Sequence, residues 1–463
     1  MTSDGWKSPL SSHAHWFSIT VHWIDKDFNL RHVLFDLYNA ELHSTADVIL
    51  RQWMTHLQPL NVNYTPFGIV TDGDAATHNA RVALCTNLDM RGIWCVCHRL
   101  NLVSKYIVAI EEVQIAYNKC KKIQKMAKKS SVFAGIFQNL KQKKTIQLCS
   151  ASEIRWNSAF NMFKSFLVNQ SALEQTLEQT NYPPRKRLNA QDWSSMTMAN
   201  EILGIIKPEI QFFQAENETT ISSVFPRLLF TKDLIRQLSP DNKIADEADA
   251  ELVHYFPWLS SWDPPSPEFT TFSSASFLDP RYKDFFFISD PRKREQLLQS
   301  LLPALAEILP PSGTTDVPNN AKESPVMIHM RQQSRIAERR TEVERYIGIA
   351  RDTDISEDPL KFWRQVKRND FPTLSQVARR VLSLPASSAT SERAFSAANA
   401  VLSKSRTRLS SVSSRSACMI TVNKSLLSSI RELPSLSPDQ ITAFFAEEED
   451  GEEEEEGEEE ANE

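Results

Sequence analysis

The amino-acid sequence predicts an α/β fold in which a mixed β-sheet with flanking helices is joined to a long helical region. Residues 16–110 read in the order strand, strand, helix, strand, strand, helix, which is typical of helices packed on a sheet. Residues 166–310 instead show helical periodicity with irregular breaks. The length of 463 residues, of which 41% are hydrophobic, allows a large buried core and about two to three domains.

The first expected elements form a hairpin followed by a helix. Residues 16–24 alternate between apolar and polar side chains, and a polar turn at 25–27 leads to a second strand over 30–37. Residues 45–57 then place their large apolar side chains on one helical face.

Two short apolar strands and a helix follow. The run 67–71 ends at Asp72, the run 93–96 is a further strand, and residues 98–110 have a helical pattern. Helical patterns return in an amphipathic run over about 326–350 and in a segment from 359 to 430.

The net charge of −6 hides two differently charged parts of the chain. Residues 447–463 carry 13 acidic side chains and no basic one, which is typical of a disordered tail. The rest of the chain has 52 Lys and Arg against 45 Asp and Glu, or about +7. A moderately basic body permits nucleic-acid binding without proving it.

The cysteines and the hydropathy pattern exclude secreted and membrane classes. Six cysteines in a chain of this length do not form a disulfide framework, and reduced thiols fit a cytosolic or nuclear compartment. No apolar run approaches the ~18 residues that a membrane span requires. We therefore expect no membrane partner.

Three acidic residues are candidates for metal binding. Asp72 follows an apolar strand, at the sheet edge where functional groups usually emerge, although Asp72-Gly73-Asp74 is also good turn chemistry. Asp4 precedes Gly5 and has the same turn alternative. Glu392 heads a helix after residues 385–388, where a carboxylate also favours the helix dipole and Ser387 or Ser388 would be the N-cap.

Three converging carboxylates can hold two divalent cations for phosphodiester chemistry. Oxygen-only ligands suit Mg²⁺ or Mn²⁺. Sequence spacing alone does not show that the three acids converge.

Two further groups of residues suggest binding. Lysines cluster between residues 119 and 144, and Lys121, Lys122 and Lys125 are candidate phosphate contacts. A solvated helical surface explains them equally well. Cys95 and His98 have the spacing of half a zinc site, but a second ligand pair is missing, so a structural zinc is not expected.

Several blocks, in this order, resemble the hAT superfamily of cut-and-paste DNA transposases, with its zinc-finger BED and C-terminal dimerisation regions. Their order and spacing over roughly residues 1–430 make the resemblance specific. The blocks are Thr2–Ser8, Val70–Asp74 with Cys95–Leu102, Arg155–Ser158, a weaker match at Leu278–Lys283, and Phe371–Asn423 around the core Ser391–Ser396.

The resemblance implies an α/β RNase H-like core interrupted by a large all-α insertion, with a helical C-terminal dimerisation region. The expected organisation is a first core part at 1–165, a helical insertion domain at 166–308, a linker at 309–325, the end of the core with the dimerisation region at 326–440, and an acidic disordered tail at 441–463.

The resemblance also implies roles for individual residues. Asp4, Asp72 and Glu392 match the metal-binding catalytic triad. In the family's chemistry, water cleaves one DNA strand and the freed hydroxyl attacks the opposite strand to leave a hairpin. Trp156 matches the aromatic residue that stacks on an unpaired base, and the adjacent Arg155 and His98 are expected beside the DNA, with Cys95 packing beneath.

The last block implies a homodimer or higher homo-oligomer. The expected dimerisation residues are Phe395, Leu402 and Leu409, although these apolar stripes would serve equally as intramolecular core. The implied partner is DNA, at transposon ends or in chromatin, and the implied location is the nucleus.

The chain departs from the family pattern near its start. No BED zinc finger precedes Asp4, and the strand that should carry this acid is expected to be nearly absent. Two functions therefore remain: a transposase core that cuts DNA with Mg²⁺ or Mn²⁺, or a domesticated, catalytically inactive nuclear protein that binds DNA or chromatin and dimerises.

Overall fold

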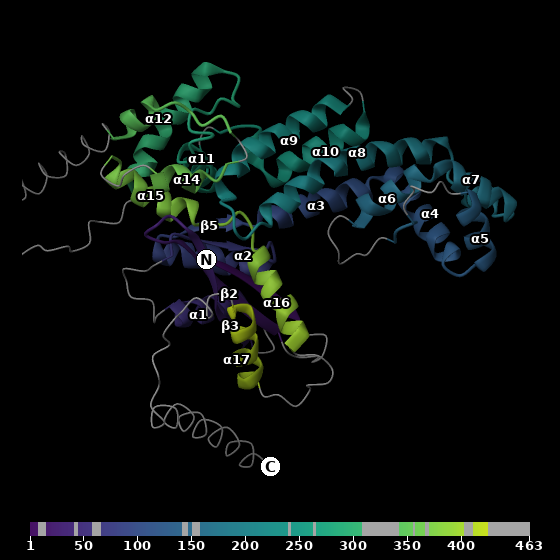
Figure 1. The fold of residues 1–463 in the computed structure, drawn as a ribbon, viewed down its shortest axis with the longest axis horizontal. Coiled ribbons are helices and arrows are strands. Elements are labelled where there is room, and N and C mark those ends of the chain that lie inside the picture. The colour runs from purple at the N-terminus through teal and green to yellow at the C-terminus, as the bar shows by residue number, and fades with distance from the viewer. Residues whose placement is uncertain are drawn as a thin grey trace, which may run out of the picture. The chain divides into compact units, whose positions relative to one another are not determined.

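A computed structural model describes most of the chain, and Figure 1 shows its ribbon. No helix among the described residues is both long enough and apolar enough to cross a membrane. The described residues are 1–7, 15–40, 45–57, 66–140, 147–150, 158–238, 242–262, 265–307, 342–354, 357–365, 370–401 and 411–424.

The described strands form one mixed sheet of five strands in the order β3-β2-β1-β4-β5. β1 pairs with β2 in antiparallel fashion, as β2 does with β3, whereas β1–β4 and β4–β5 are parallel. The mixed sheet predicted from the sequence is therefore confirmed. The strands are β1 (Thr2–Lys7), β2 (His15–Ile24), β3 (Leu30–Ala40), β4 (Gly68–Thr71) and β5 (Arg91–Trp94).

The hairpin of β2 and β3 is confirmed, and its polar turn explains its register. Asp25 Oδ1 accepts hydrogen bonds from the backbone N–H groups of Asp27 and Asn29, each at 2.9 Å. Phe28 adopts a positive φ of 57°, and its side chain is buried. These contacts close the turn so that Ile24 lies opposite Leu30.

The prediction that the first strand is nearly absent was wrong. β1 has six residues and lies in the centre of the sheet, fully paired with β2 and joined to β4 at Thr2. Gly5, which suggests a turn in the sequence, is needed for close packing because an added Cβ would lie 3.1 Å from the Phe17 ring. The dipeptide Asp4-Gly5 is therefore strand rather than turn.

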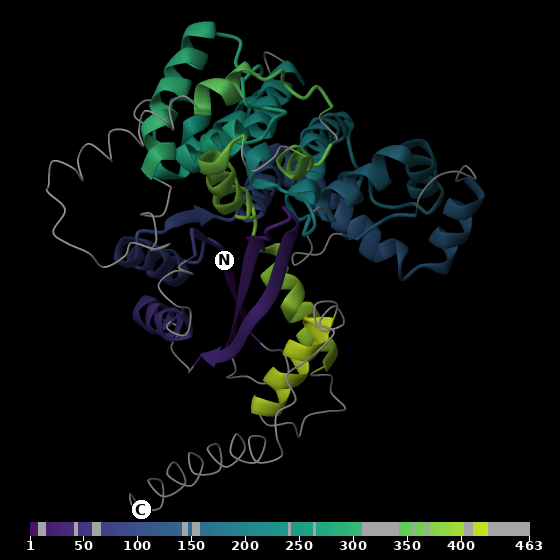
Figure 2. The ribbon, with the colours of Figure 1, turned by 60° about the vertical axis from the view of Figure 1, so that its left-hand side comes forward.

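Helices cover both faces of the sheet, as Figure 2 shows. On one face, α1 (Ala46–Leu57) and α2 (Ala75–Leu88) bury a cluster that includes Phe17, Ile19 and Ile69. Side chains alternate along a strand, so the neighbouring Val70 faces the other way and joins the larger core with Ile93. That second face carries the three acids discussed below.

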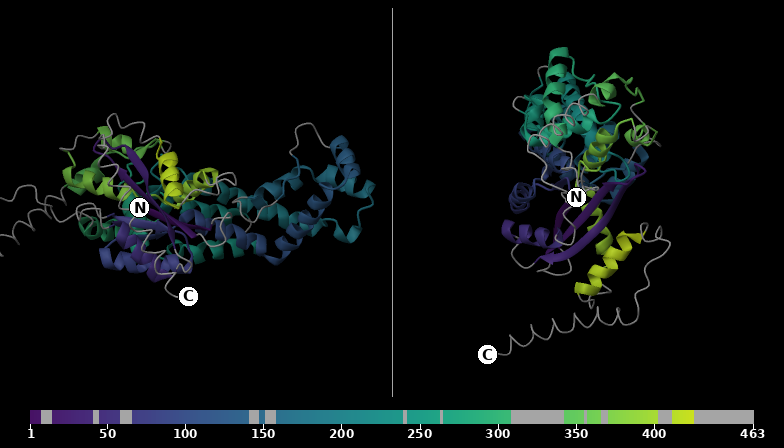
Figure 3. Two further views of the ribbon diagram at one scale, coloured as in Figure 1. Left: turned by 90° about the horizontal axis from the view of Figure 1, so that it is seen from below. Right: turned by 90° about the vertical axis from the view of Figure 1, so that its left-hand side faces the viewer.

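Helices dominate the chain after β5. α8, of 24 residues, packs against α3, α4, α6, α9 and α10, and an Asn189–Asp192 capping box fixes its start. Figures 1 and 3 show α4 to α7 grouped beyond α3. The bounds are α3 (Val96–Ala109), α4 (Glu111–Ala127), α5 (Ser131–Leu140), α6 (Ser158–Val168), α7 (Gln170–Gln179), α8 (Ala190–Phe213), α9 (Val224–Leu238), α10 (Lys243–Tyr255), α11 (Pro267–Phe277) and α12 (Pro291–Glu307).

The start of α3 differs from the prediction, whereas the predicted domain boundaries are not tested by the structure. α3 begins at Val96, earlier than the predicted residue 98, because the Cys95 side chain caps the helix. The domain boundary at 165 remains a prediction, and it falls within α6. The linker 309–325 and the tail 441–463 lie outside the described residues.

The C-terminal region is helical, as the sequence predicts. Residues 342–348 are helical, and the Glu342 carboxylate caps the start of α15 by accepting the Leu374 N–H at 2.7 Å. The four further helices are α14 (Pro359–Gln365), α15 (Pro372–Leu382), α16 (Ala389–Val401) and α17 (Ser411–Val422).

The segment Leu278–Lys283 forms a buried polar network between the helices. Asp279 is fully buried and pairs with Arg281 through two bonds of 2.9 and 2.7 Å, while the Ser222 hydroxyl donates to it at 2.6 Å. Lys283 Nζ donates to the Tyr346 carbonyl at 2.6 Å. These partners join the end of α11 to η3 (Ile221–Ser223) and to residues 342–348. This family-like segment therefore has a structural role.

Candidate active site

Strand register places two of the candidate acids side by side. Thr2 on β1 lies opposite Val70 on the parallel strand β4. Asp4 and Asp72 each follow two residues later, so they share one level and one face of the sheet. Thr71 lies opposite Trp94 on β5, which brings Cys95 level with Asp72. The row Asp4, Asp72 and Cys95 thus crosses the sheet from the middle of β1 to the ends of β4 and β5.

The third acid comes from α16, which packs on β1 and β2 over the same face. The Ser391 and Thr2 hydroxyl oxygens are 2.8 Å apart, and a further hydrogen bond joins Thr2 to Thr20. Glu392 follows Ser391 in the first turn of α16. The buried hydroxyl contact therefore holds Glu392 beside the strand that carries Asp4.

The electrostatics show that the three carboxyl groups share one site. Asp4 is only 8% exposed. Its pKa lies well above the ordinary value because it is buried and because Asp72, Glu392 and Cys95 add negative charge nearby. Burial, with the charges of Cys95 and Asp72, raises the pKa of Glu392 to about 7. Residues from the two ends of the chain therefore repel one another across a short distance.

Asp72 carries an unsatisfied oxygen at the centre of this row. Burial, together with the charge of Asp74, raises its pKa. Its Oδ1 atom is buried and has no hydrogen-bond partner. The Trp94 ring lies close to the next residue, because a Cβ added to Gly73 would come within 2.5 Å of it. A buried carboxylate oxygen without a donor is costly unless a ligand satisfies it.

Cys95 joins the two helices that begin at this edge of the sheet. Its fully buried sulfur accepts the N–H of His98 in α3 and the N–H of Ser388 ahead of α16, each at 3.4 Å. Burial alone would raise the pKa of the thiol, but hydrogen bonds from Cys97, Ser388 and His98 outweigh it and lower the pKa to about 6. The sequence reading, which placed Cys95 as packing, missed this role.

The segment before α16 is also attached to the helical region. The Ala386 carbonyl accepts the Val96 N–H at 3.0 Å, and its own N–H donates to Thr220 Oγ1 at 3.0 Å. The Ser387 hydroxyl donates to the Phe213 carbonyl, at the end of α8, at 2.7 Å. The position of Glu392 therefore depends on the end of α8 as well as on the sheet.

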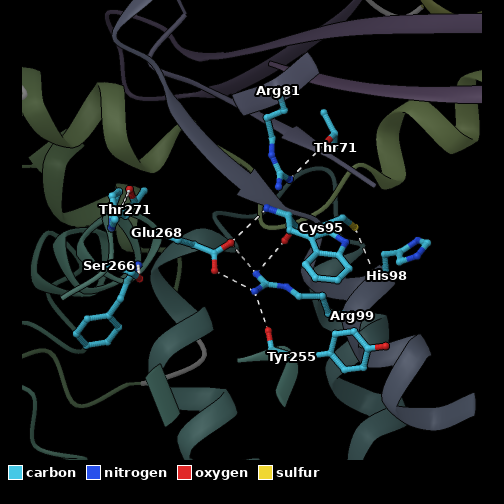
Figure 4. Close-up of polar contacts among 12 residues, drawn as sticks. Thr71, Arg81, Cys95, His98, Arg99, Tyr255, Ser266, Glu268 and Thr271 are labelled. Atoms are coloured by element: carbon cyan, nitrogen blue, oxygen red, sulfur yellow. Dashed lines mark hydrogen bonds and ion pairs between the residues drawn. The ribbon is translucent and has the colours of Figure 1, made fainter. Parts of the chain in front are cut away.

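A second buried network lies at the end of β5, beside Cys95 (Figure 4). Arg99 is 2% exposed in its side chain and pairs with Glu268 of α11 through two bonds of 2.9 Å. The same guanidinium donates to the carbonyls of Trp94 and Tyr255, and Glu268 accepts the Trp94 N–H at 3.2 Å. This clamp fixes the end of β5. Nothing local in the sequence links Arg99 to Glu268.

The donor chemistry of the site fits a hard divalent cation, since carboxylate oxygens carry the charge and one of them lacks a partner. Within the part of the chain that the structure describes, however, no three Asp, Glu, His or Cys side chains form a ready metal cluster. Asp4, Asp72 and Glu392 therefore interact by charge without forming a closed ligand shell.

The remaining candidate residues fall into three groups. His98 lies next to this site, with its pKa lowered by burial and by Lys105. Lys121, Lys122 and Lys125 lie together on one exposed face of α4. The others, Arg155, Trp156, Leu402 and Leu409, are outside the described residues.

Phe395, expected at a dimer contact, is packed inside the chain. It is 4% exposed and clusters with Trp16, Leu37 and Cys418. Arg415 of α17 also pairs with the buried Asp36 of β3 at 2.8 Å. The structure thus places this side chain in intramolecular packing, the alternative that the sequence left open.

The fold and the site define a class of protein in which a mixed sheet carries acidic residues at one edge. The third acid follows a long helical region in the chain. Comparisons with known proteins show which family the chain resembles. Residues 342–424 match the hAT family C-terminal dimerisation region, and residues 93–202 match the ZBED1 RNase-like helical domain. The resemblance to the hAT superfamily is thus confirmed.

One relative covers most of the chain. It is a Zea mays protein named "Putative AC transposase", which is 23% identical over 89% of this chain and 54% of its own length. The chain thus spans about half the length of this relative. The dimerisation region supports homo-oligomerisation of this chain.

Proposed function

We propose that this chain is the catalytic core of a hAT-type transposase, which cuts DNA at phosphodiester bonds on the acidic edge of an RNase H-like sheet. The observation that carries the proposal is the register of β1 and β4, which sets Asp4 beside Asp72, together with α16, which brings Glu392 to the same face. Carboxylates so far apart in sequence gain nothing structurally from sharing a buried site, because they repel each other.

The strand order and the chain path support the same proposal. Asp4 lies on the central strand β1, and Asp72 directly follows β4, its parallel neighbour. The helical region matched by the family model then separates the second acid from the third. The relative from Zea mays is named as a transposase, which is consistent with DNA as the substrate.

Asp4, Asp72 and Glu392 would hold Mg²⁺ or Mn²⁺, which supplies an activated water and neutralises charge on the leaving oxygen. The protein's own part is to align these carboxyl groups and to shield them from bulk water. Glu392 has to lose its proton first, since its pKa is about 7 in the metal-free site. Asp72 Oδ1, which has no hydrogen-bond partner, is the oxygen best placed to accept a cation.

The proposed cycle includes the rest of the family's chemistry. One strand is cut by water, and the freed hydroxyl closes a hairpin on the flanking DNA while Trp156 stacks on the unpaired base. We place the protein in the nucleus, as a dimer or larger assembly. Light scattering on the purified chain at micromolar concentration tests the assembly, and a clean monomer contradicts it.

The decisive experiment is strand cleavage of duplex DNA that carries the flanking repeats, in the presence of Mg²⁺ or Mn²⁺. Glu392→Gln and Asp72→Asn should each lower the rate by at least about 10³-fold, because each removes a charge that develops its effect in the transition state. Glu209→Gln is the matched control, since Glu209 pairs with Arg227 in the helical region.

Equal cleavage by the wild type and Glu392→Gln would remove the catalytic assignment. A wild-type chain that binds DNA but leaves it uncut with both metals would instead be the non-catalytic, domesticated DNA-binding protein.

A further inference from the structure

A lysine-rich groove lies on α4, in the helical region. Its volume is about 500 Å³. The described residues that line it include no aspartate or glutamate. They are Asn118, Lys121, Lys122, Gln124, Lys125, Lys128, Lys129, Ser150 and Met162.

The spacing of the five lysines puts them on one face. Positions 121, 125 and 128 are separated by four and three residues, and 122, 125 and 129 by three and four, so both rows follow one side of the helix. All five side chains are exposed, whereas the intervening Ile123 and Gln124 are buried. The lysines are therefore held as an array by the buried side of α4.

Another lysine on the same helix, Lys119, has a structural role and differs from the five lysines of the groove. Lys119 points toward α8 and pairs with Asp192, which belongs to the capping box of that helix. In the groove, Lys128 Nζ donates to Ser150 Oγ at 3.4 Å, and Lys121 lies over the Tyr117 ring. Like charges at these spacings repel each other, so an anion in the groove would be stabilised.

The length of the array fits a phosphate backbone. Eight residue steps from Lys121 to Lys129 span about 12 Å of helix. One strand of duplex DNA carries a phosphate about every 3.4 Å along its axis, so about three or four phosphates pass over such a length. Lysine ammonium groups contact phosphates as point charges and do not read base edges.

We propose that this groove is a second DNA site, which holds the phosphate backbone of a duplex without sequence preference and apart from the acidic edge. The proposal deepens the proposed function, because it assumes that DNA is the substrate.

The test measures binding of the full-length chain to a 30-base-pair duplex of arbitrary sequence by fluorescence anisotropy, at several salt concentrations. EDTA is present, so no metal-dependent cleavage interferes. A triple variant, Lys121→Gln, Lys125→Gln and Lys128→Gln, should bind about tenfold to a hundredfold more weakly at 0.1 M salt. The slope of log K against log salt should become shallower by about 2.7, or 0.9 for each lost phosphate contact.

A matched variant controls for net charge. Lys243→Gln, Arg292→Gln and Lys293→Gln remove the same charge from exposed positions outside the groove. Equal weakening by both triple variants would overturn the groove assignment. Tighter binding of duplex RNA than of duplex DNA, with the same lysine dependence, would overturn the choice of DNA.

The outcomes also separate this inference from the proposed chemistry. A wild-type chain that binds DNA through the groove but never cuts it with Mg²⁺ or Mn²⁺ keeps the groove and removes the nuclease. A chain that cuts DNA while both triple variants bind as the wild type does keeps the nuclease and removes the groove.

Discussion

Two buried clusters of charge in this molecule follow opposite rules. In the buried polar network at Leu278–Lys283, the Asp279 carboxylate accepts short hydrogen bonds from Arg281 and Ser222 on both of its oxygens. At the acidic edge, burial raises the pKa of Asp4, Asp72 and Glu392, and the charge of Asp72 raises it further for Asp4 and Glu392.

The difference separates structure from function. A buried charge with a complete set of partners holds helices together. Removal of one member of such an ion pair leaves the other charge unpaired in the low dielectric of the core. Buried charges of one sign that repel one another destabilise the fold, so they persist where a ligand or a reaction uses them. The family-like segment at Leu278–Lys283 belongs to the first kind and the acids to the second.

The largest expected effect on stability comes from a substitution in the buried polar network at Leu278–Lys283. Arg281→Met leaves Asp279 buried without its ion pair and should lower the free energy of unfolding by about 3–5 kcal/mol. Urea denaturation monitored by tryptophan fluorescence measures it. The double variant Asp279→Asn with Arg281→Met should recover part of the loss. A loss below 1 kcal/mol for Arg281→Met would contradict the structural role of the pair.

The variant Cys95→Ala should change both the stability of the fold and the rate of cleavage. It removes the acceptor shared by His98 and Ser388, so it should lower the free energy of unfolding by about 2 kcal/mol and slow cleavage at least tenfold through displacement of α16. Cys95→Ser retains an acceptor and should keep most activity. Cys120→Ala deletes an equally buried thiol in α4 and serves as the control. Equal activity in all three variants would exclude a positioning role for Cys95.

The acidic edge should respond to pH in the direction opposite to a salt-bridged carboxylate. Below its ordinary pKa of 4.5, Glu392 is protonated in both states; between 4.5 and about 7, the unfolded chain releases the proton while the folded chain retains it. The metal-free free energy of unfolding should therefore fall as pH rises through this window, by about 3 kcal/mol. Glu392→Gln should remove this part of the fall and be more stable than the wild type at pH 8.

Calorimetry of both proteins between pH 5 and pH 8, with EDTA, measures the difference. Parallel curves for the wild type and Glu392→Gln would show that Glu392 is not the buried acid described here.

The smallest expected effect concerns an exposed pair beside the acids. Arg393 contacts Glu216 at 2.7 Å, and 46% of its side chain is exposed. Arg393→Met should cost less than about 1 kcal/mol, because solvent screens such pairs. A loss as large as that of Arg281→Met would erase the contrast between buried and exposed partners.

Local patterns in the sequence predicted much of the fold. Alternation predicted the hairpin of β2 and β3, and the apolar run before Asp72 predicted β4. β1 could not be recognised, since Asp4-Gly5 has turn chemistry, and only its two neighbouring strands and the Phe17 ring explain why it is extended.

The site was less accessible to sequence reasoning. The acids were named through the family resemblance, but their meeting depends on parallel register and on the packing of α16. Arg99 and Glu268 could not be paired because they lie 169 residues apart, and local propensity carries no information about such contacts.

The helix α8 also sets a length scale. Its first turn is tied to the lysine-bearing helix through Asp192 and Lys119, and its last residue, Phe213, receives the Ser387 hydroxyl beside the acids. Twenty-four residues of helix measure about 36 Å. One turn of B-form DNA is about 34–36 Å. A duplex that touched both ends of α8 would therefore present the same side of its backbone to the proposed groove and to the acids.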